Sequence, residues 1–137
     1  MGKVKHLLSL FIPTFKRPVA IDNLLYSIIE DNSKHLGSIP IYISSNSPED
    51  KDTLERVYKW KEKYPYISYF VNERNIGLDA NHDKIYEYCQ NSKYALAIAD
   101  DDLLLPDALR EIIMLCKNDF LFALGNCVSY NKIGGVL

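Results

Sequence analysis

Short runs of apolar residues alternate along the chain with longer stretches in which apolar and polar residues mix. The short runs are rich in leucine, β-branched and aromatic residues and are bounded by proline, glycine or polar clusters, so they predict strands. These strands are expected at residues 7–12, 39–44, 67–71, 94–99 and 120–128. Pro13 cannot donate to a sheet ladder, so it should end the first strand.

The mixed stretches predict four amphipathic helices, two of them in the first half of the chain. The first begins at Pro18 and ends between residues 31 and 37, and its inward stripe has helical spacing: Ile21, Leu24, Leu25, Ile28 and Ile29. The second covers residues 48–63, with Ser47 as its cap. Its inner edge is expected at Leu54, Val57 and Tyr58, with either Trp60 or Lys61 as a further position.

The other two helices follow the third and fourth strands. One covers residues 78–90 and turns Ile85, Tyr88 and Cys89 inward. The other begins at Pro106 and buries Leu109, Ile112, Ile113 and Cys116. Strands separated by helices form right-handed βαβ units, which predicts an α/β fold, a three-layer α/β/α sandwich with a mostly parallel sheet. Ligands of such sheets bind beyond the carboxyl ends of the strands.

Length and composition narrow the classes of protein that fit this pattern. The chain has 137 residues, enough for one domain, and 47% of them are hydrophobic. The formal net charge is −2, which leaves no basic field for nucleic acid. Three widely spaced cysteines favour reduced thiols, and no apolar run has the length of a signal peptide core or a membrane span. A cytoplasmic protein is therefore expected.

Polar residues with binding chemistry follow the first two strands. Thr14 offers a hydroxyl, Phe15 a flat stacking face and Arg17 a planar fork suited to phosphate or carboxylate. An ordinary strand-to-helix loop would also explain this segment. After the second strand, Ser45 or Asn46 could read a nucleobase edge, although a helix cap and loop contacts explain these residues more simply.

The segment after the third strand combines a glycine with several amides and acids. Gly77 permits backbone conformations that other residues resist, and Asn75, Asp79 and Asn81 surround it. A loop and a helix cap account for only part of this set. His82, at the same helix start, is given no role.

Three consecutive carboxylates follow the fourth strand directly. In an extended segment Asp100 and Asp102 would point the same way and Asp101 the opposite way. Carboxylates this close repel one another unless a positive group lies between them. Mg²⁺ or Mn²⁺ would suit that place, because hard cations are held by one or two carboxylates together with substrate phosphates. The alternative is a solvated acidic turn before the helix at Pro106.

With these residues assembled, the chain resembles family 2 glycosyltransferases of the GT-A fold over roughly residues 7–124. Residues 8–18 (LSLFIPTFKRP) are similar to the family's opening strand and its P-T-Y-N-R-P segment, with Phe15 for the usual Tyr and Lys16 for the usual Asn. Residues 75–81 (NIGLDAN) look like its N-x-G segment. Residues 99–109 (ADDDLLLPDAL) are similar to the acidic segment that holds the metal.

The resemblance implies an inverting, metal-dependent transfer of sugar from a nucleoside diphosphate sugar to an acceptor hydroxyl. It implies Mn²⁺ or Mg²⁺ as cofactor, with Asp100 and Asp102 as the metal residues. The nucleotide-sugar residues that it implies are Pro13, Thr14, Phe15, Arg17, Ser45, Asn75, Gly77, Asn81, Asp100 and Asp101. The expected role of such a protein is in polysaccharide biosynthesis.

Two departures from the family pattern change what is expected. The family usually has an aspartate after the second strand, and Ser45 stands at the matching place, which leaves the base preference open. The family's catalytic base and acceptor-binding strands lie in a second half, so the base is expected beyond Leu137. We therefore expect residues 1–137 to be a single nucleotide-sugar-binding domain, the N-terminal part of a longer glycosyltransferase. Its acceptor would be a glycan or a lipid-linked molecule, and a longer form could associate peripherally with a membrane.

Two other readings remain open from the sequence. A receiver-type signalling domain has similar length and an acidic Mg²⁺ pocket, but it should carry acids after the first strand and a phosphate-accepting aspartate after the third. A non-catalytic nucleotide-binding module would keep the fold with a decayed metal site.

Overall fold

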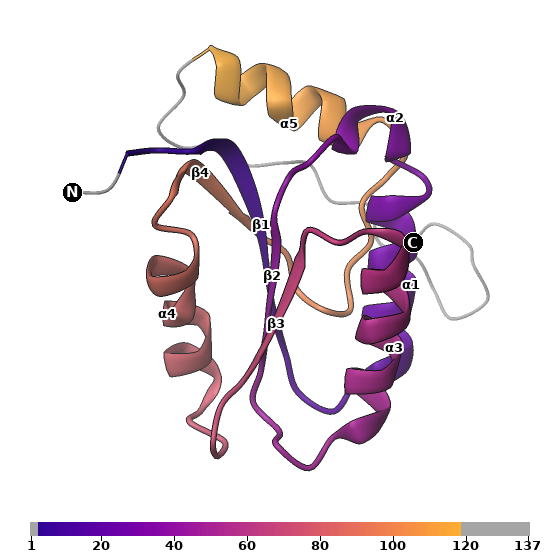
Figure 1. The fold of residues 1–137 in the computed structure, drawn as a ribbon, viewed down its shortest axis with the longest axis vertical. Helices are drawn as coiled ribbons and strands as arrows, with labels where there is room; N and C mark the ends of the chain where they lie inside the picture. Colours follow the sequence, from indigo (N-terminus) through magenta and orange to yellow (C-terminus); the bar gives the residue numbers. More distant parts are fainter. Residues whose placement is uncertain (1–2, 119–137) are drawn as a thin grey trace, which may run out of the picture.

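The computed structural model describes residues 3–118, in which four strands and five helices follow one another along the chain (Figure 1). The strands are β1 (His6–Thr14), β2 (Ile41–Ser45), β3 (Ile67–Val71) and β4 (Ser92–Ala97). The helices are α1 (Pro18–Ile29), α2 (Ser33–Leu36), α3 (Lys51–Lys63), α4 (Leu78–Tyr88) and α5 (Ala108–Lys117). The predicted strand at residues 120–128 lies outside the described residues.

The four strands form one parallel sheet in the order β3-β2-β1-β4. In this register Thr14 lies beside Ser45, and Ser45 lies beside Val71. The carboxyl ends of β1, β2 and β3 therefore lie at one edge of the sheet. The prediction for β4 was two residues late at each end, so Ile98 and Ala99 separate the strand from Asp100.

Helices cover both faces of the sheet, which confirms the predicted three-layer α/β/α fold. α1 and α3 lie together on one face, and α4 lies on the other (Figure 1). Among residues 3–118, no helix is both long enough and apolar enough to cross a lipid bilayer.

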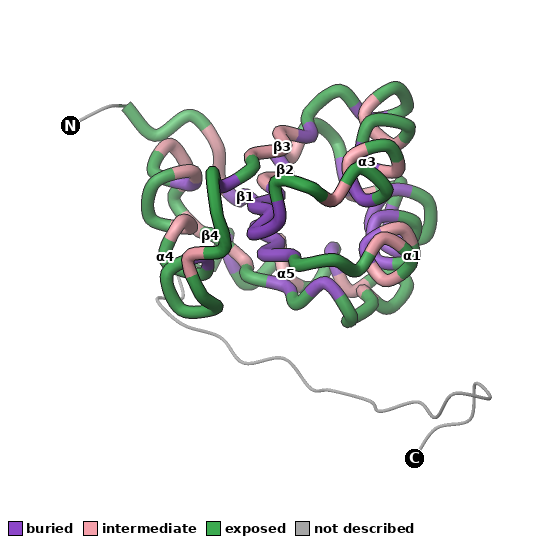
Figure 2. Tube along the Cα trace, turned by 90° about the horizontal axis from the view of Figure 1, so that it is seen from below, coloured by how far each residue is buried: buried purple, intermediate pink, exposed green. Residues whose placement is uncertain are grey.

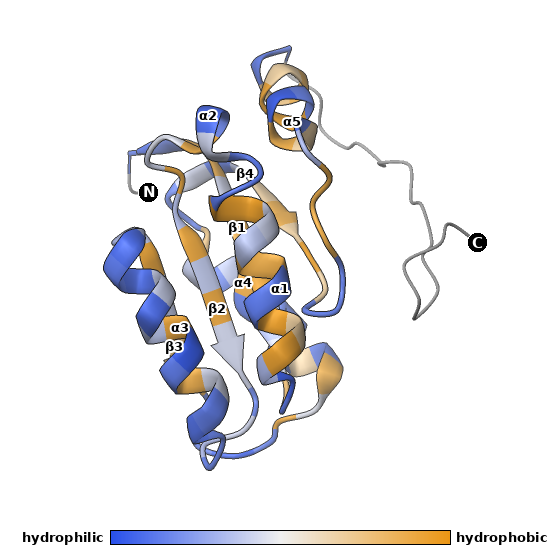
Figure 3. Cartoon of the chain, turned by 90° about the vertical axis from the view of Figure 1, so that its right-hand side faces the viewer, coloured by the Kyte–Doolittle hydropathy of each residue, from blue (hydrophilic) through white to orange (hydrophobic). Residues whose placement is uncertain are grey.

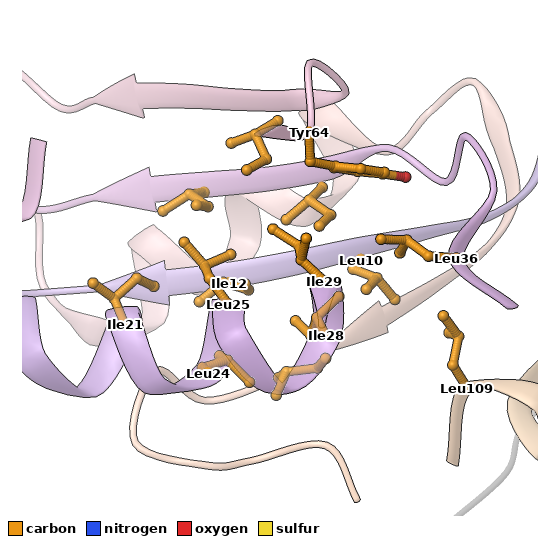
Figure 4. Packing of buried hydrophobic residues seen from close by; sticks show 14 of the residues in the cluster. Leu10, Ile12, Ile21, Leu24, Leu25, Ile28, Ile29, Leu36, Tyr64 and Leu109 are labelled. Atoms are coloured by element: carbon orange, nitrogen blue, oxygen red, sulfur yellow. The ribbon is translucent and has the colours of Figure 1, made fainter. Parts of the chain in front are cut away.

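The main core lies between the central strands and α1. Leu10 and Ile12 of β1 meet Leu25 and Ile28 of α1, and Leu109 of α5 closes one end of the cluster (Figure 4). All five residues predicted for the inward stripe of α1 are buried. The burial of each aliphatic side chain contributes about 1.5–3 kcal/mol to the free energy of folding. The cluster therefore stabilises the packing of α1 against the sheet. Figure 2 shows the same concentration of buried residues along β1 and β2.

α3 is more polar than α1 and buries less of its surface (Figure 3). Its buried residues are Thr53 and Val57. The prediction that Tyr58 faces inward was wrong, because 52% of this residue is exposed. The stripe on α4 was also only partly right, since Cys89 is buried while Ile85 and Tyr88 are half-buried.

The structure corrects four predicted helix boundaries, one of which is the end of α4, which lies at Tyr88 rather than at residue 90. α1 ends at Ile29, residues 30–32 form a turn, and Ser33–Leu36 form the separate short helix α2. α3 begins at Lys51 rather than at residue 48, and its cap is Asp50 rather than Ser47. α5 begins at Ala108, two residues after Pro106.

Candidate functional site

A cleft of about 330 Å³ opens at the carboxyl edge of the sheet. Eight of the ten predicted nucleotide-sugar residues line it: Pro13, Thr14, Phe15, Arg17, Asn75, Gly77, Asn81 and Asp100. Ser45 and Asp101 are absent from its lining within residues 3–118, and Asn46 and Leu78 complete it. Segments more than 80 residues apart in the sequence thus meet at one site, because the strands that carry them are parallel.

Thr14 and Arg17 hold the first two carboxylates of the acidic segment. Thr14 Oγ1 donates a hydrogen bond to Asp100 Oδ2 over 2.8 Å. Arg17 Nη1 lies 3.1 Å from Asp100 Oδ1 and 2.8 Å from Asp101 Oδ2. Asp100 is 6% exposed, whereas Asp101 and Asp102 lie at the surface. The positive group between the two carboxylates is therefore a guanidinium.

The expected alternation of the three aspartates is wrong. The chain turns at this point, and the backbone N–H of Asp102 donates to the carbonyl oxygen of Ala99 over 3.1 Å. In a turn, side chains no longer alternate as they do in a strand. Asp100 and Asp101 consequently face the same guanidinium, and within residues 3–118 Arg17 forms no such contact with Asp102.

The aspartates differ in how well they suit a metal ion. Across residues 3–118, no three His, Cys, Asp or Glu side chains gather around a shared point. Both carboxylate oxygens of Asp100 already accept hydrogen bonds from Thr14 and Arg17. The Asp102 carboxylate is exposed, and within residues 3–118 it has no hydrogen bond or ion pair and is absent from the cleft lining. A hard cation held by one carboxylate and by substrate phosphates fits Asp102.

The opposite wall of the cleft is built around the side-chain amide of Asn46. Asn46 Oδ1 accepts from Asn72 Nδ2 and from the backbone N–H of Ile76, both over 3.0 Å. Asn46 Nδ2 donates to Asn75 Oδ1 over 2.9 Å and to the carbonyl oxygen of Gly77 over 3.0 Å. An amide can make four such bonds, so Asn46 has none left for a nucleobase.

A second layer of polar contacts fixes α4 against β2. Asn81 Oδ1 accepts from Ser44 Oγ over 2.7 Å and from Asn72 Nδ2 over 2.9 Å, while its Nδ2 donates to the Ser44 carbonyl oxygen. Gly77, with φ of 90°, takes the left-handed backbone conformation that glycine favours. Sequence reasoning missed Asn72 altogether. The asparagines that follow β2 and β3 were the available signal.

Ser45 takes no part in the cleft wall. Its side chain is fully buried, and Ser45 Oγ accepts from the backbone N–H of Ser47 over 3.3 Å. The predicted contact of Ser45 with a nucleotide stays a prediction, and Asn46 is the residue of this segment that lines the cleft.

The loop between β1 and α1 is shaped by Lys16. Lys16 has φ of 51°, a left-handed conformation that Asn adopts more readily than Lys. Lys16 Nζ lies 2.9 Å from Glu49 Oε1, and this hydrogen bond lowers the pKa of Glu49. Phe15 of the same loop is 42% exposed and lines the cleft, and Lys16 Nζ lies 5.2 Å from the centroid of its ring.

Two other groups near the sheet bear on reactivity. Burial raises the pKa of the Cys89 thiol to about 11, so the thiol stays protonated near neutral pH. His82 is exposed at the start of α4 and meets the ring of Phe11 edge-on at 6.2 Å between centroids. It is absent from the cleft lining that the structure describes.

The parallel sheet and the polar cleft at its carboxyl edge place the chain among α/β proteins that bind ligands at their strand ends. Within that class, the chain belongs to glycosyl transferase family 2, which it matches over residues 9–136. It is 30% identical over 122 residues to the GalNAc(5)-diNAcBac-PP-undecaprenol beta-1,3-glucosyltransferase of Campylobacter jejuni, a match that covers 88% of this chain.

Solved structures agree on the fold. TarS of S. aureus matches 81% of this chain with a TM-score of 0.69 and 18% identity. The mannosyltransferase PcManGT of Pyrobaculum calidifontis, in complex with GDP-Man and Mn²⁺, matches 77% with a TM-score of 0.64 and 14% identity. These likenesses confirm the predicted GT-A fold class.

The chain is much shorter than these proteins. It spans 38% of the length of the Campylobacter relative, 19% of the TarS chain and 31% of the PcManGT chain.

Proposed function

We propose that this chain supplies the donor site of an inverting, metal-dependent glycosyltransferase that uses a nucleoside diphosphate sugar. The observation that carries the proposal is the arrangement around Asp100: Thr14 and Arg17 fix it at the cleft, and the exposed Asp102 follows two residues later. The Mn²⁺ and GDP-Man named with PcManGT support the same pairing of metal and nucleotide.

The cleft offers each part of a nucleoside diphosphate a suitable group. The exposed ring of Phe15 can stack on a base, and the half-exposed guanidinium of Arg17 can bind phosphate. Asp102 would hold the divalent cation, which would neutralise the charge that develops on the departing diphosphate. Hydrogen bonds among Asn46, Asn75 and Gly77 hold one wall of the cleft together.

The proposed reaction is a direct displacement at the anomeric carbon. The acceptor oxygen forms a bond to that carbon, the bond to the diphosphate oxygen breaks, and a carboxylate takes the hydroxyl proton. We place that carboxylate beyond Leu137. A lipid-linked glycan is the acceptor class we propose, supported by the undecaprenol-linked substrate in the name of the Campylobacter relative.

The receiver-type domain and the non-catalytic nucleotide-binding module are the two alternative functions, and they are not equally well supported. A receiver-type domain requires an aspartate at the end of the third strand, and Asn72 occupies that position with its side chain in the cleft wall network. A non-catalytic nucleotide-binding module would keep the cleft and lose the metal. Metal dependence of nucleotide binding therefore separates it from the proposed function.

Isothermal titration with Mn²⁺ and a panel of nucleoside diphosphates tests the proposal. We expect at least one nucleotide to bind, with the affinity falling about tenfold or more in EDTA and in Asp102→Ala. Asp31→Ala, which removes an exposed carboxylate at the far end of α1, is the control and should bind as the unaltered chain does. Failure of every nucleotide to bind would rule the proposal out, and binding that ignores Mn²⁺ would favour the non-catalytic module.

A further inference from the structure

β3 is an outer strand of the sheet, and within residues 3–118 its one neighbouring strand is β2. The Asn72 N–H, just after β3, donates to the Ser45 carbonyl oxygen of β2 over 2.9 Å. Backbone groups alternate in direction along a strand, so the even-numbered residues of β3 bond to β2. The N–H and carbonyl groups of Tyr69 and Val71 therefore point outward from the edge of the sheet.

The sequence of β3 does not protect this edge. Its five residues, ISYFV, include no proline and no charged residue, and most of them are β-branched or aromatic. Edge strands usually carry a proline or a lysine, because an open edge is a template for pairing with another strand. β4, the other outer strand of the described sheet, contains Lys93. The outer edge of β3 is therefore the one suited to pairing.

Apolar surface is exposed at both ends of β3. Tyr66, which precedes the strand, is 51% exposed, and Val71 at its end is 44% exposed. Ile67 and Tyr69 lie on the same face of the strand as Val71 and pack toward the core. α3 and α4 lie on either side of β3 (Figure 1). A strand added along the edge would cover Val71 and continue the sheet.

The charges of α3 and of the turn before it favour an antiparallel neighbour of the same kind. Residues 49–55 carry four acidic side chains and one lysine, whereas residues 56–63 carry four basic side chains and one glutamate. A two-fold axis through paired edge strands keeps both α3 helices on one face of the joined sheet and makes them run in opposite directions. The acidic start of each helix then lies toward the basic end of the other, and the two attract.

We propose that β3 pairs antiparallel with β3 of a second copy of this chain, across a two-fold axis between the two Tyr69 residues. In this register the outward N–H and carbonyl groups of Tyr69 in the two copies bond to each other. Val71 of each copy lies opposite Ile67 of the other, so the exposed valine gains an apolar neighbour. The inference does not depend on the proposed function, because it concerns a different edge of the molecule.

This dimer would also brace the wall of the cleft. Asn72 follows β3 directly, and its amide donates to Asn46 and Asn81. Pairing along β3 would hold the strand that carries Asn72, while the two clefts would open at opposite ends of the joined sheet because the strands are antiparallel.

Sedimentation equilibrium of residues 1–137 over a range of concentrations tests the association. We expect the average mass to rise with concentration and to level off at twice the mass of one chain. Val71→Lys should weaken the dimer about tenfold or more, because a symmetric interface places the new charge twice against Ile67. Val19→Lys makes the same change at an exposed position of α1 and, as the matched control, should leave the dimer unchanged.

Two further measurements guard against a folding defect in Val71→Lys. Circular dichroism and the midpoint of urea unfolding should match those of the control, since Val71 is exposed. Raising the NaCl concentration of the unaltered chain, which requires no substitution, should also weaken the dimer because the attraction between the α3 helices is screened.

Amide hydrogen exchange followed by nuclear magnetic resonance locates the interface. The Ser68 and Phe70 amides bond to β2 and should be protected at every concentration. The Tyr69 and Val71 amides should become protected only as the dimer forms, and the Tyr69 amide should lose this protection in Val71→Lys.

The inference is overturned if the mass stays at that of one chain up to about 1 mM, if it grows past two chains, or if Val71→Lys associates as tightly as Val19→Lys. Protection of the Tyr69 and Val71 amides in the monomer would also overturn it, because another segment of the same chain would then cover the edge. Nucleotide binding is measured separately on the same preparation, so a failure of this inference leaves the proposed function standing.

Discussion

Asn46 uses every hydrogen-bonding position of its side-chain amide. Its four partners come from the end of β3 and from the loop that precedes α4, so one side chain holds two segments 26 to 31 residues away. Asn46 is only 4% exposed, and an amide buried to this degree is costly unless it is satisfied. The residue lines the cleft, yet its function is to shape the wall.

The substitution Asn46→Asp tests this structural role. The new oxygen would face the Asn75 Oδ1 and Gly77 carbonyl oxygens, which are both acceptors, and two hydrogen bonds would become repulsive contacts. We expect the free energy of unfolding to fall by about 1–3 kcal/mol and nucleotide affinity to fall with it. Urea unfolding followed by the fluorescence of the single tryptophan, Trp60, measures the first effect.

The control for this experiment is Asn23→Asp, the same change at an exposed position of α1. It should leave the midpoint of urea unfolding nearly unchanged. If Asn46→Asp proves as stable as this control, the hydrogen bonds of Asn46 do not stabilise the cleft wall.

The positions of some site residues could be predicted from the sequence, whereas the contacts of others could not. Thr14, Arg17 and Asp100 could be predicted because each lies at or soon after the end of a strand, and parallel strands bring their carboxyl ends together. The prediction that Pro13 ends the first strand was wrong, since β1 continues through Pro13 to Thr14. The partners of Asn46 could not be predicted, since they depend on the conformation of a loop far along the chain. The direction of the aspartates was wrong because the chain turns after Ala99.

At the scale of elements, the start of α3 shows that two nearby residues can each be suitable as a helix cap. Ser47 and Asp50 both favour a helix start, and the sequence does not decide between them. In the structure residues 47–50 form a turn, with the Asp50 N–H donating to the Ser47 carbonyl oxygen, and α3 starts one residue later. Pro106 is likewise not the start of α5, because Asp107 takes a left-handed conformation with φ of 64° before the helix begins. Strand and helix identity follows from hydrophobic spacing, whereas exact ends depend on such local contacts.

The cap of α3 provides a prediction at this scale. Asp50 Oδ1 accepts from the backbone N–H of Thr53 over 3.1 Å, and Asp50 Oδ2 accepts from Thr53 Oγ1 over 2.5 Å. Asp50→Ala removes both bonds and should lower the free energy of unfolding by about 1 kcal/mol. Thermal and urea unfolding monitored by circular dichroism measure this loss.

Asp52→Ala is the comparison for the cap. Asp52 lies in the first turn of the same helix, so its loss removes a similar charge near the helix terminus without removing the cap. A loss of a few tenths of a kcal/mol is expected. Equal losses in the two variants would show that Asp50 acts through its charge alone.

For the whole molecule, the order of strands explains why so short a sequence assembles a complete cleft. β1 lies between β2 and β4, so the loop after β1 can contact both the Asn46 segment and the aspartates. The alternation of strands and helices predicts a parallel sheet and a ligand edge. It does not predict which asparagine side chains form the cleft wall. Their contacts depend on the distances between loops, and these distances follow from how the sheet packs.

The same arrangement bears on whether the described residues could supply the base for the proposed sugar transfer. Asp100 is the sole carboxylate among the cleft-lining residues that the structure describes, and both its oxygens are engaged by Thr14 and Arg17. A general base must be free to accept a proton within hydrogen-bonding distance of the acceptor hydroxyl, so the Asp100 carboxylate is unsuited to that role.

We therefore predict that residues 1–137 bind a nucleoside diphosphate sugar in the presence of Mn²⁺ yet release no nucleoside diphosphate above the rate without protein. A coupled assay of nucleoside diphosphate release, run on a preparation whose donor binding has been measured by calorimetry, checks this. Release above background that disappears in Asp102→Ala would mean that these residues contain a working base. Asp100 would then be the candidate base, and a bound donor would have to draw Arg17 away from it toward the diphosphate.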